Sequence, residues 1–249
     1  MNNPAQATST PNTHGAADAP LERAFAALAK YDTGSPRASL LPIDAAVAAA
    51  VNNPASRGEL EHRFGTLLEA GASTVAREYI CAKLTVVGSD ASVPRLKPLL
   101  NDPHLATGAR NALEAIPGLA AARALIQNLA AAAPNEKVGA INSLGARREE
   151  TAVRPLARLL RDADAEVAAA AAAALGEIGS RRCARALRAC YAEASDTVKQ
   201  RISDAMLTCA EHLADAGEKT GARSLYETLS GAPQPKHVQL AIARGLAKS

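Results

Sequence analysis

The sequence predicts an all-α protein built as an α-solenoid, a stack of repeated helix pairs. The first observation behind this is a leucine, once replaced by methionine, that recurs at steps of 29, 31, 31, 31 and 40 residues: Leu84, Leu113, Leu144, Leu175, Met206 and Leu246. We call these the register leucines. Self-similarity at a period near 30 is typical of proteins whose units bury an apolar face only by stacking on their neighbours.

The second observation is a segment that occurs twice. A pattern of four apolar residues and one aspartate recurs 60 residues apart, at Val93, Leu96, Leu99, Leu100 and Asp102 and again at Val153, Leu156, Leu159, Leu160 and Asp162. This offset equals two register steps, so both helices of a unit keep phase with the register leucine. Four units also carry an apolar residue eight positions earlier, on the same helix face: Leu105, Val167, Val198 and Val238.

Each unit is expected to be a helix, a tight turn and a second helix. The expected pairs are 57–70 with 73–87, 90–100 with 104–116, 118–131 with 135–145, 150–161 with 165–178, 180–193 with 196–211, and 217–230 with 236–247. Two further helices, at 21–30 and 40–51, are expected to cap the array. The predicted organisation is a disordered polar leader over 1–20, N-terminal capping helices over 21–56, and a repeat array of about six pairs over 57–249.

Composition excludes few partners. A formal net charge of +3 does not require nucleic acid or a membrane surface. The alanine-rich run over 167–175 is far shorter than the roughly 18 apolar residues of a membrane helix, so no membrane span is predicted. Residues 1–20 lack the basic start and apolar centre of a signal peptide. We expect a soluble protein, cytoplasmic if the chain is complete; compartment and oligomeric state are otherwise open.

Catalytic and metal-binding motifs are missing from the sequence. None of the cysteines Cys81, Cys183, Cys190 and Cys209 forms a C-x-x-C pair, and we expect them to be buried apolar side chains. The histidines do not form H-E-x-x-H, and there is no G-x-S-x-G, P-loop or dinucleotide-binding motif. The sequence therefore predicts no enzyme, no metal site and no cofactor.

A resemblance to a known family appears in the fourth unit. Residues 152–167 read AVRPLARLLRDADAEV and are followed by an alanine run and LGEIG at 175–179. This segment resembles the HEAT-like repeat of the phycobilisome-lyase type, and the resemblance extends more loosely over 57–249. Residues 141–148 also resemble HEAT modules of larger multidomain bacterial proteins. The resemblance implies a bacterial α-solenoid module for macromolecular binding, in a family too varied in function to imply one activity.

The chain departs from the HEAT pattern at one position. The family usually has an arginine directly after the conserved valine, and the corresponding residues here are Ala106, Lys137, Ala168, Lys199 and Gln239. We therefore expect the arginine to aspartate tie between neighbouring units to be absent or weakened.

Helical geometry indicates one candidate binding surface. The resemblance implies that the second helix of each pair lines the concave side of the array. On these helices, polar residues two or six positions before the register leucine form a candidate peptide-binding surface. We call this surface the polar strip: Thr107, Asn111, Asn142, Gln200 and Asp204. Seven alanines at 168–174 would add a weakly apolar floor. The alternatives are an ordinary solvated helix face for the strip and tight helix packing for the alanines.

A second candidate surface lies on the first helices. Ten residues after the register leucine, three successive units carry an arginine, and we call this set the arginine ladder: Arg123, Arg154 and Arg185. Nine arginines against six acidic residues over 147–188 make this region basic. Guanidinium groups there would suit an anionic partner, either an acidic protein or a phosphate backbone. Arginine stems that only cover apolar surface are the alternative.

The sequence therefore predicts a non-enzymatic protein–protein interaction scaffold that binds another protein or another domain of its parent chain. Two alternatives stay open. A bilin or cofactor lyase or chaperone is indicated only by the repeat subtype. Nucleic-acid binding through the arginine ladder would depend steeply on salt, and nucleic acid is the less favoured partner. A base-flipping HEAT-like glycosylase is not supported, because the concave positions carry no aromatic side chain to stack on a base.

Overall fold

The computed structural model describes residues 14–194 and 196–248, and these ranges contain fourteen α-helices, four short 3-10 helices and no strand. The all-α fold class is confirmed. The chain divides into two compact units, 1–80 and 81–249, with the division inside helix α4 (Thr74–Val87). Residues 1–13 of the predicted leader lie outside the described residues. Residues 14–20 belong to helix α1 (His14–Leu28), where the alanines at 16, 17 and 19 favour helix over the expected leader.

The first unit is a small helical assembly. After α1 come a 3-10 turn, η1 (Arg37–Leu40), and the helices α2 (Leu41–Ala50) and α3 (Pro54–Glu69). Helix α1 packs on η1 and α2, and α2 packs on α3. Its core side chains are fully buried and include Leu28, Ile43 and Phe64. The helices expected at 21–30, 40–51 and 57–70 are therefore present, with α1 beginning earlier than expected.

The second unit continues from the end of α4 through alternating helices. In chain order these are η2 (Asp90–Ser92), α5 (Val93–Leu96), η3 (Lys97–Asn101), α6 (Ala106–Ala115), α7 (Leu119–Asn128), α8 (Pro134–Ala146), η4 (Glu150–Ala152), α9 (Val153–Leu159), α10 (Ala165–Ile178), α11 (Arg181–Glu193), α12 (Asp196–Asp215), α13 (Lys219–Ser230) and α14 (Lys236–Lys248). The expected helix pairs are confirmed. The first member of the pair at 90–100 is split into η2, α5 and η3.

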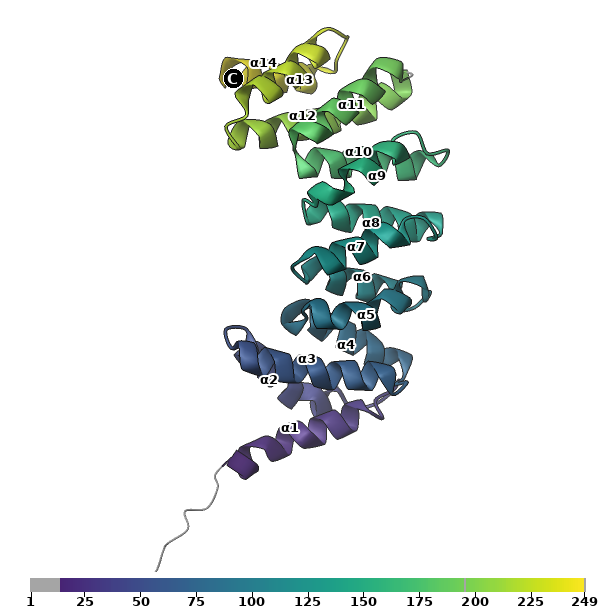
Figure 1. Ribbon diagram of the computed structural model, residues 1–249, viewed down its shortest axis with the longest axis vertical. Coiled ribbons are helices and arrows are strands. Elements are labelled where there is room, and N and C mark those ends of the chain that lie inside the picture. The colour runs from purple at the N-terminus through teal and green to yellow at the C-terminus, as the bar shows by residue number, and fades with distance from the viewer. Residues whose placement is uncertain (1–13, 195, 249) are drawn as a thin grey trace, which may run out of the picture. The chain divides into compact units, whose positions relative to one another are not determined.

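The second unit is an α-solenoid whose helices form two layers. In one layer α6 packs on α8, α8 on α10, α10 on α12 and α12 on α14. In the other α5 packs on α7, α9 on α11 and α11 on α13. Figure 1 shows these helices stacked pair upon pair from the teal to the yellow part of the chain. We call the two sets the even layer and the odd layer.

Five of the six register residues are buried in the core of the second unit, and Leu246 near the end of α14 is partly exposed. Leu113, Leu144, Leu175 and Met206 have no exposed surface, and Leu84 is 1% exposed. Complete burial of one such side chain contributes roughly 1.5–3 kcal/mol. Val198, expected on the same buried face, is instead 40% exposed. It lies in the first turn of α12 and lines an apolar cavity together with alanines of α10.

Glycine follows the register leucine where consecutive even-layer helices approach most closely. A Cβ atom on Gly145 would lie 2.9 Å from the Ala174 Cα atom in the next unit. A Cβ atom on Gly176, one period later, would lie 2.8 Å from the Ala205 carbonyl oxygen. Both distances are too short for a side chain, so the leucine-glycine pair allows the backbones of α8, α10 and α12 to pack directly.

Within the second unit, two kinds of polar contact join neighbouring helix-pair repeats. Lys137 stands where HEAT repeats usually have arginine, and its Nζ atom lies 3.7 Å from the Asp162 Oδ2 atom. The tie was expected to be absent or weakened, and at this position it is present as a lysine pair at 3.7 Å. Asp162 also accepts a hydrogen bond from the Asp164 amide at 3.0 Å, as Asp102 does from the His104 amide at 2.9 Å. The two aspartates, 60 residues apart, thus stabilise equivalent turns.

Arg147 supplies the second tie. Its Nη1 atom donates hydrogen bonds to the carbonyl oxygens of Leu113, Glu114 and Ile116, at 2.8, 2.9 and 2.5 Å. Its Nη2 atom donates to the Gly118 carbonyl oxygen at 2.8 Å. The last carbonyls of a helix have no partner within the helix, so this one guanidinium satisfies the end of α6 and fixes the turn into α7.

Replacing Arg147 with lysine should destabilise the fold. A lysine ammonium cannot span four carbonyl oxygens as the planar guanidinium does, so we expect the free energy of unfolding to fall by about 1–3 kcal/mol. Urea unfolding followed by circular dichroism measures this. The matched control is Arg154→Lys, since Arg154 is exposed and makes no described hydrogen bond. Equal stability of both variants would contradict the proposed role of Arg147.

Candidate functional site

The polar strip lies on the even layer, and all its members are exposed. Thr107 and Asn111 stand on α6, Asn142 on α8, and Gln200 and Asp204 on α12. Helix α10, between α8 and α12, contributes only alanines to this face. Among the described residues, no hydrogen bond joins two side chains of the strip. The strip therefore remains a prediction, divided by α10 into two polar patches.

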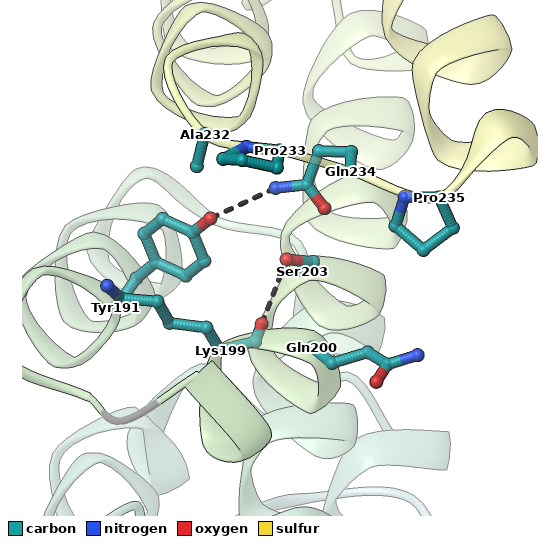
Figure 2. A pocket seen from close by; sticks show the side chains of 8 residues that line it. All are labelled: Tyr191, Lys199, Gln200, Ser203, Ala232, Pro233, Gln234 and Pro235. Carbon is teal, nitrogen blue, oxygen red and sulfur yellow. Dashed lines mark hydrogen bonds between the residues drawn. The ribbon is translucent and has the colours of Figure 1, made fainter.

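A cavity of about 430 Å³ lies beside Gln200, between α11, α12 and the loop at 232–235. Figure 2 shows the Gln234 side chain reaching across to Tyr191, and its Nε2 atom donates to the Tyr191 Oη atom at 3.0 Å. The same Nε2 atom donates to the Leu229 carbonyl oxygen at 3.3 Å. The Lys199 ammonium lies 5.8 Å from the centre of the Tyr191 ring, a cation–π distance. Gln234 therefore holds the loop over an aromatic and cationic wall.

Sequence reasoning missed Tyr191 and Gln234 as a pair. They are 43 residues apart and belong to different units. The spacing from the register leucine predicts the helix face on which a residue lies, but it does not predict how a loop folds against a helix. The two prolines that flank Gln234 were the available signal for an ordered loop.

The alanine run serves mainly packing. Ala170, Ala171, Ala172 and Ala174 are buried between helices, and Ala173 is exposed. Part of the run lines an apolar cavity of about 380 Å³, together with Leu160, Val198 and Ile202. The rim of this cavity carries charged side chains that are already paired, such as Arg201 with Glu166 at 3.5 Å. The predicted apolar floor is thus limited to one side of α10.

The arginine ladder lies on the odd layer. Arg123, Arg154 and Arg185 stand on α7, α9 and α11, and all three are exposed. None of them makes an ion pair or hydrogen bond to another described residue. Helices α7, α9 and α11 together contain seven arginines and one glutamate, whereas α6, α8, α10 and α12 contain eight acidic residues and four lysines or arginines. Arginine is therefore concentrated on α7, α9 and α11, where Arg181 and Arg182 pair with Glu218 and Glu150 and the ladder arginines do not.

The four cysteines are free and buried, as expected. Burial raises the pKa of the Cys183 and Cys190 thiols and raises the pKa of Cys209 to about 12. The Cys183 sulfur also accepts a hydrogen bond from the Ser180 hydroxyl at 3.3 Å. Because the thiolate is the reactive form, Cys183, Cys190 and Cys209 are poor nucleophiles and poor metal ligands at neutral pH. No described helix is long and apolar enough to cross a bilayer.

Comparison with known protein families identifies the repeat. Residues 122–207, from α7 to α12, match the family model of HEAT repeats. This chain contains HEAT repeats. The matched residues include all three members of the arginine ladder, Arg123, Arg154 and Arg185. No curated protein matches the sequence.

Two solved structures match this chain distantly. One is the crystal structure of an engineered protein, 18% identical with a TM-score of 0.43, covering 83% of this chain and 96% of that one. The other is the complex of CpcE and CpcF of phycocyanin lyase from Nostoc sp. PCC7120, 18% identical with a TM-score of 0.44, covering 99% of this chain and 98% of that one. Similarity at this level is not evidence of a shared activity.

The buried thiols give a pH-dependent prediction. At about pH 8 a chromogenic disulfide reagent should modify the folded chain at least tenfold more slowly than the urea-unfolded chain, in which all four thiols are accessible. In the folded chain the pKa of Cys209 is raised, so the fraction of Cys209 present as thiolate keeps rising with pH towards about pH 12. In the unfolded chain the thiol has its ordinary pKa near 9, so its thiolate fraction levels off above that pH.

Stopped-flow absorbance from about pH 8 to 11 measures both rates, and Cys209→Ala identifies the contribution of Cys209. Rapid stoichiometric modification of the folded chain at the lower pH would show that these cysteines are accessible and reactive.

Proposed function

We propose that this chain is a non-enzymatic protein–protein interaction scaffold and that its partner, another protein or another domain of the parent chain, binds to the arginine ladder. HEAT repeats typically mediate protein binding, which supports the general role. The observation that carries the choice of surface is that Arg123, Arg154 and Arg185 are exposed on three successive odd-layer helices without an intramolecular partner.

The charge and hydrogen-bonding geometry of arginine support an acidic protein surface as the ligand of the ladder. A guanidinium group can donate two parallel hydrogen bonds to one carboxylate, which gives orientation as well as energy. An unpaired arginine does not have to give up an existing ion pair when the partner binds. By contrast, Arg201 on the even layer is already engaged with Glu166 and with the Ala165 carbonyl oxygen. The ladder is thus the better candidate than the interrupted polar strip.

Nucleic acid is the competing ligand for a basic surface. A phosphate backbone would bind the same guanidinium groups, and its affinity would fall steeply with salt. Binding to single strands commonly adds aromatic side chains on which bases stack. The three ladder helices carry one aromatic residue, Tyr191, and it is 6% exposed. This composition favours a protein partner.

The double variant Arg123→Ala with Arg154→Ala tests the proposal and leaves Arg185 in place. We expect it to weaken binding of the physiological partner by about tenfold, because exposed ion pairs contribute up to about 1 kcal/mol each. Crosslinking in a nuclease-treated lysate of the source cells, followed by mass spectrometry, identifies the partner. Titration with the purified partner then gives the two affinities.

The control variant is Arg201→Ala with Arg223→Ala, which removes the same charge from exposed arginines that are paired with Glu166 and Glu227. It should bind like the unmodified chain. Equal binding by ladder and control variants would place the interface elsewhere. Loss of all capture after nuclease treatment would assign the ladder to nucleic acid.

A further inference from the structure

A cavity of about 450 Å³ between α11 and α13 concentrates hydrogen-bond donors. One wall is α11, which contributes three arginines at positions i, i+4 and i+7, on one face of the helix: Arg181, Arg185 and Arg188. The other wall is the first half of α13, which contributes Thr220, Gly221 and Ser224. The cavity has the size of an ordinary small-ligand site.

The charges in the cavity are only partly compensated. Arg181 donates from Nε to the Glu218 carboxylate at 2.8 Å, so its charge is neutralised. Arg188 donates from Nη1 to the Ser224 hydroxyl oxygen at 2.7 Å, and this neutral partner leaves its charge in place. Arg185 has no ion pair or hydrogen bond among the described residues. Two positive charges in the cavity are therefore available to an anion.

The hydroxyl groups of α13 face these arginines across the cavity. Because the Ser224 oxygen accepts the hydrogen bond from Arg188, its own proton points elsewhere and is available to a ligand. The Thr220 hydroxyl has no described partner. Gly221, between them, also lines the cavity. The site thus offers guanidinium donors on one wall and hydroxyl donors on the opposite wall.

We propose that this cavity binds the phosphoryl group of a phosphoserine or phosphothreonine on a partner protein. A phosphorylated side chain carries close to two negative charges and three acceptor oxygens in a tetrahedral arrangement. That charge matches Arg185 and Arg188, and those oxygens suit donors on two walls better than the two coplanar oxygens of a carboxylate. The remaining volume admits the side chain that carries the phosphoryl group.

This inference rests on the proposed function, because it takes the ligand to be part of a protein. It is nevertheless separable from that proposal. Arg123 and Arg154 belong to other helices and do not line the cavity. Arg185 belongs to both surfaces, whereas Arg188 lines only the cavity. The variant Arg123→Ala with Arg154→Ala therefore tests the ladder alone, and Arg188→Ala tests the cavity alone.

Isothermal titration with short peptides of glycine and serine tests the site. One peptide carries a single phosphoserine, and its counterparts carry serine or aspartate at that position; inorganic phosphate is titrated separately. We expect the phosphopeptide to bind at least about tenfold more tightly than the aspartate peptide, and Arg185→Ala and Arg188→Ala each to weaken it by about tenfold or more. Arg185 is exposed and unpaired, so its variant should fold normally, which circular dichroism checks.

Arg223→Ala is the matched control, because Arg223 is on α13 but pairs with Glu227 and does not line the cavity. It should keep the phosphopeptide affinity, as should the ladder variant Arg123→Ala with Arg154→Ala. Equal binding of phosphorylated and unphosphorylated peptides would overturn the inference, as would phosphopeptide binding that survives both cavity variants. Binding of inorganic phosphate without the phosphopeptide would also overturn it. Any of these results combined with partner capture by the ladder leaves the proposed function standing.

Discussion

Burial of the register leucine against the next unit is the constraint on which the second unit depends. A single helix pair has too little apolar surface to be stable alone, so each pair is completed by its neighbours. Leu144 and Leu175 are fully buried because helices on both sides cover them. The glycine after each of these leucines lets the next helix come close enough to do so. A substitution in one helix pair therefore affects the helix pairs on either side of it.

Stacking also decides which residues remain available for binding. In a two-layer array each helix buries one face, and the opposite face is exposed and free to vary in chemistry. Here α7, α9 and α11 of the odd layer expose arginines, whereas α6, α8, α10 and α12 of the even layer contain twice as many acidic as basic residues. These odd-layer helices can therefore present positive charge to a partner.

Polar groups at the ends of helices are satisfied by long side chains from neighbouring segments. Arg147 binds three carbonyl oxygens at the end of α6 and the Gly118 carbonyl oxygen before α7, and Gln234 ties the loop before α14 to Tyr191 on α11. The family's usual tie between units is kept by Lys137 and Asp162, in a lysine version. Such contacts fix the turns between stacked helices, while apolar packing supplies most of the stability.

The sequence by itself determined the helix pairs, the buried leucines and the face of each exposed arginine, because a helix of fixed period converts spacing into direction. The spacing placed Val198 on the packed face, but this side chain borders a cavity beside α10 and is 40% exposed. Only the tertiary structure decided that Arg185 is unpaired while Arg181 is neutralised by Glu218, and that the cavity faces Thr220 and Ser224. These are contacts between residues more than 30 positions apart, which spacing along one helix does not encode.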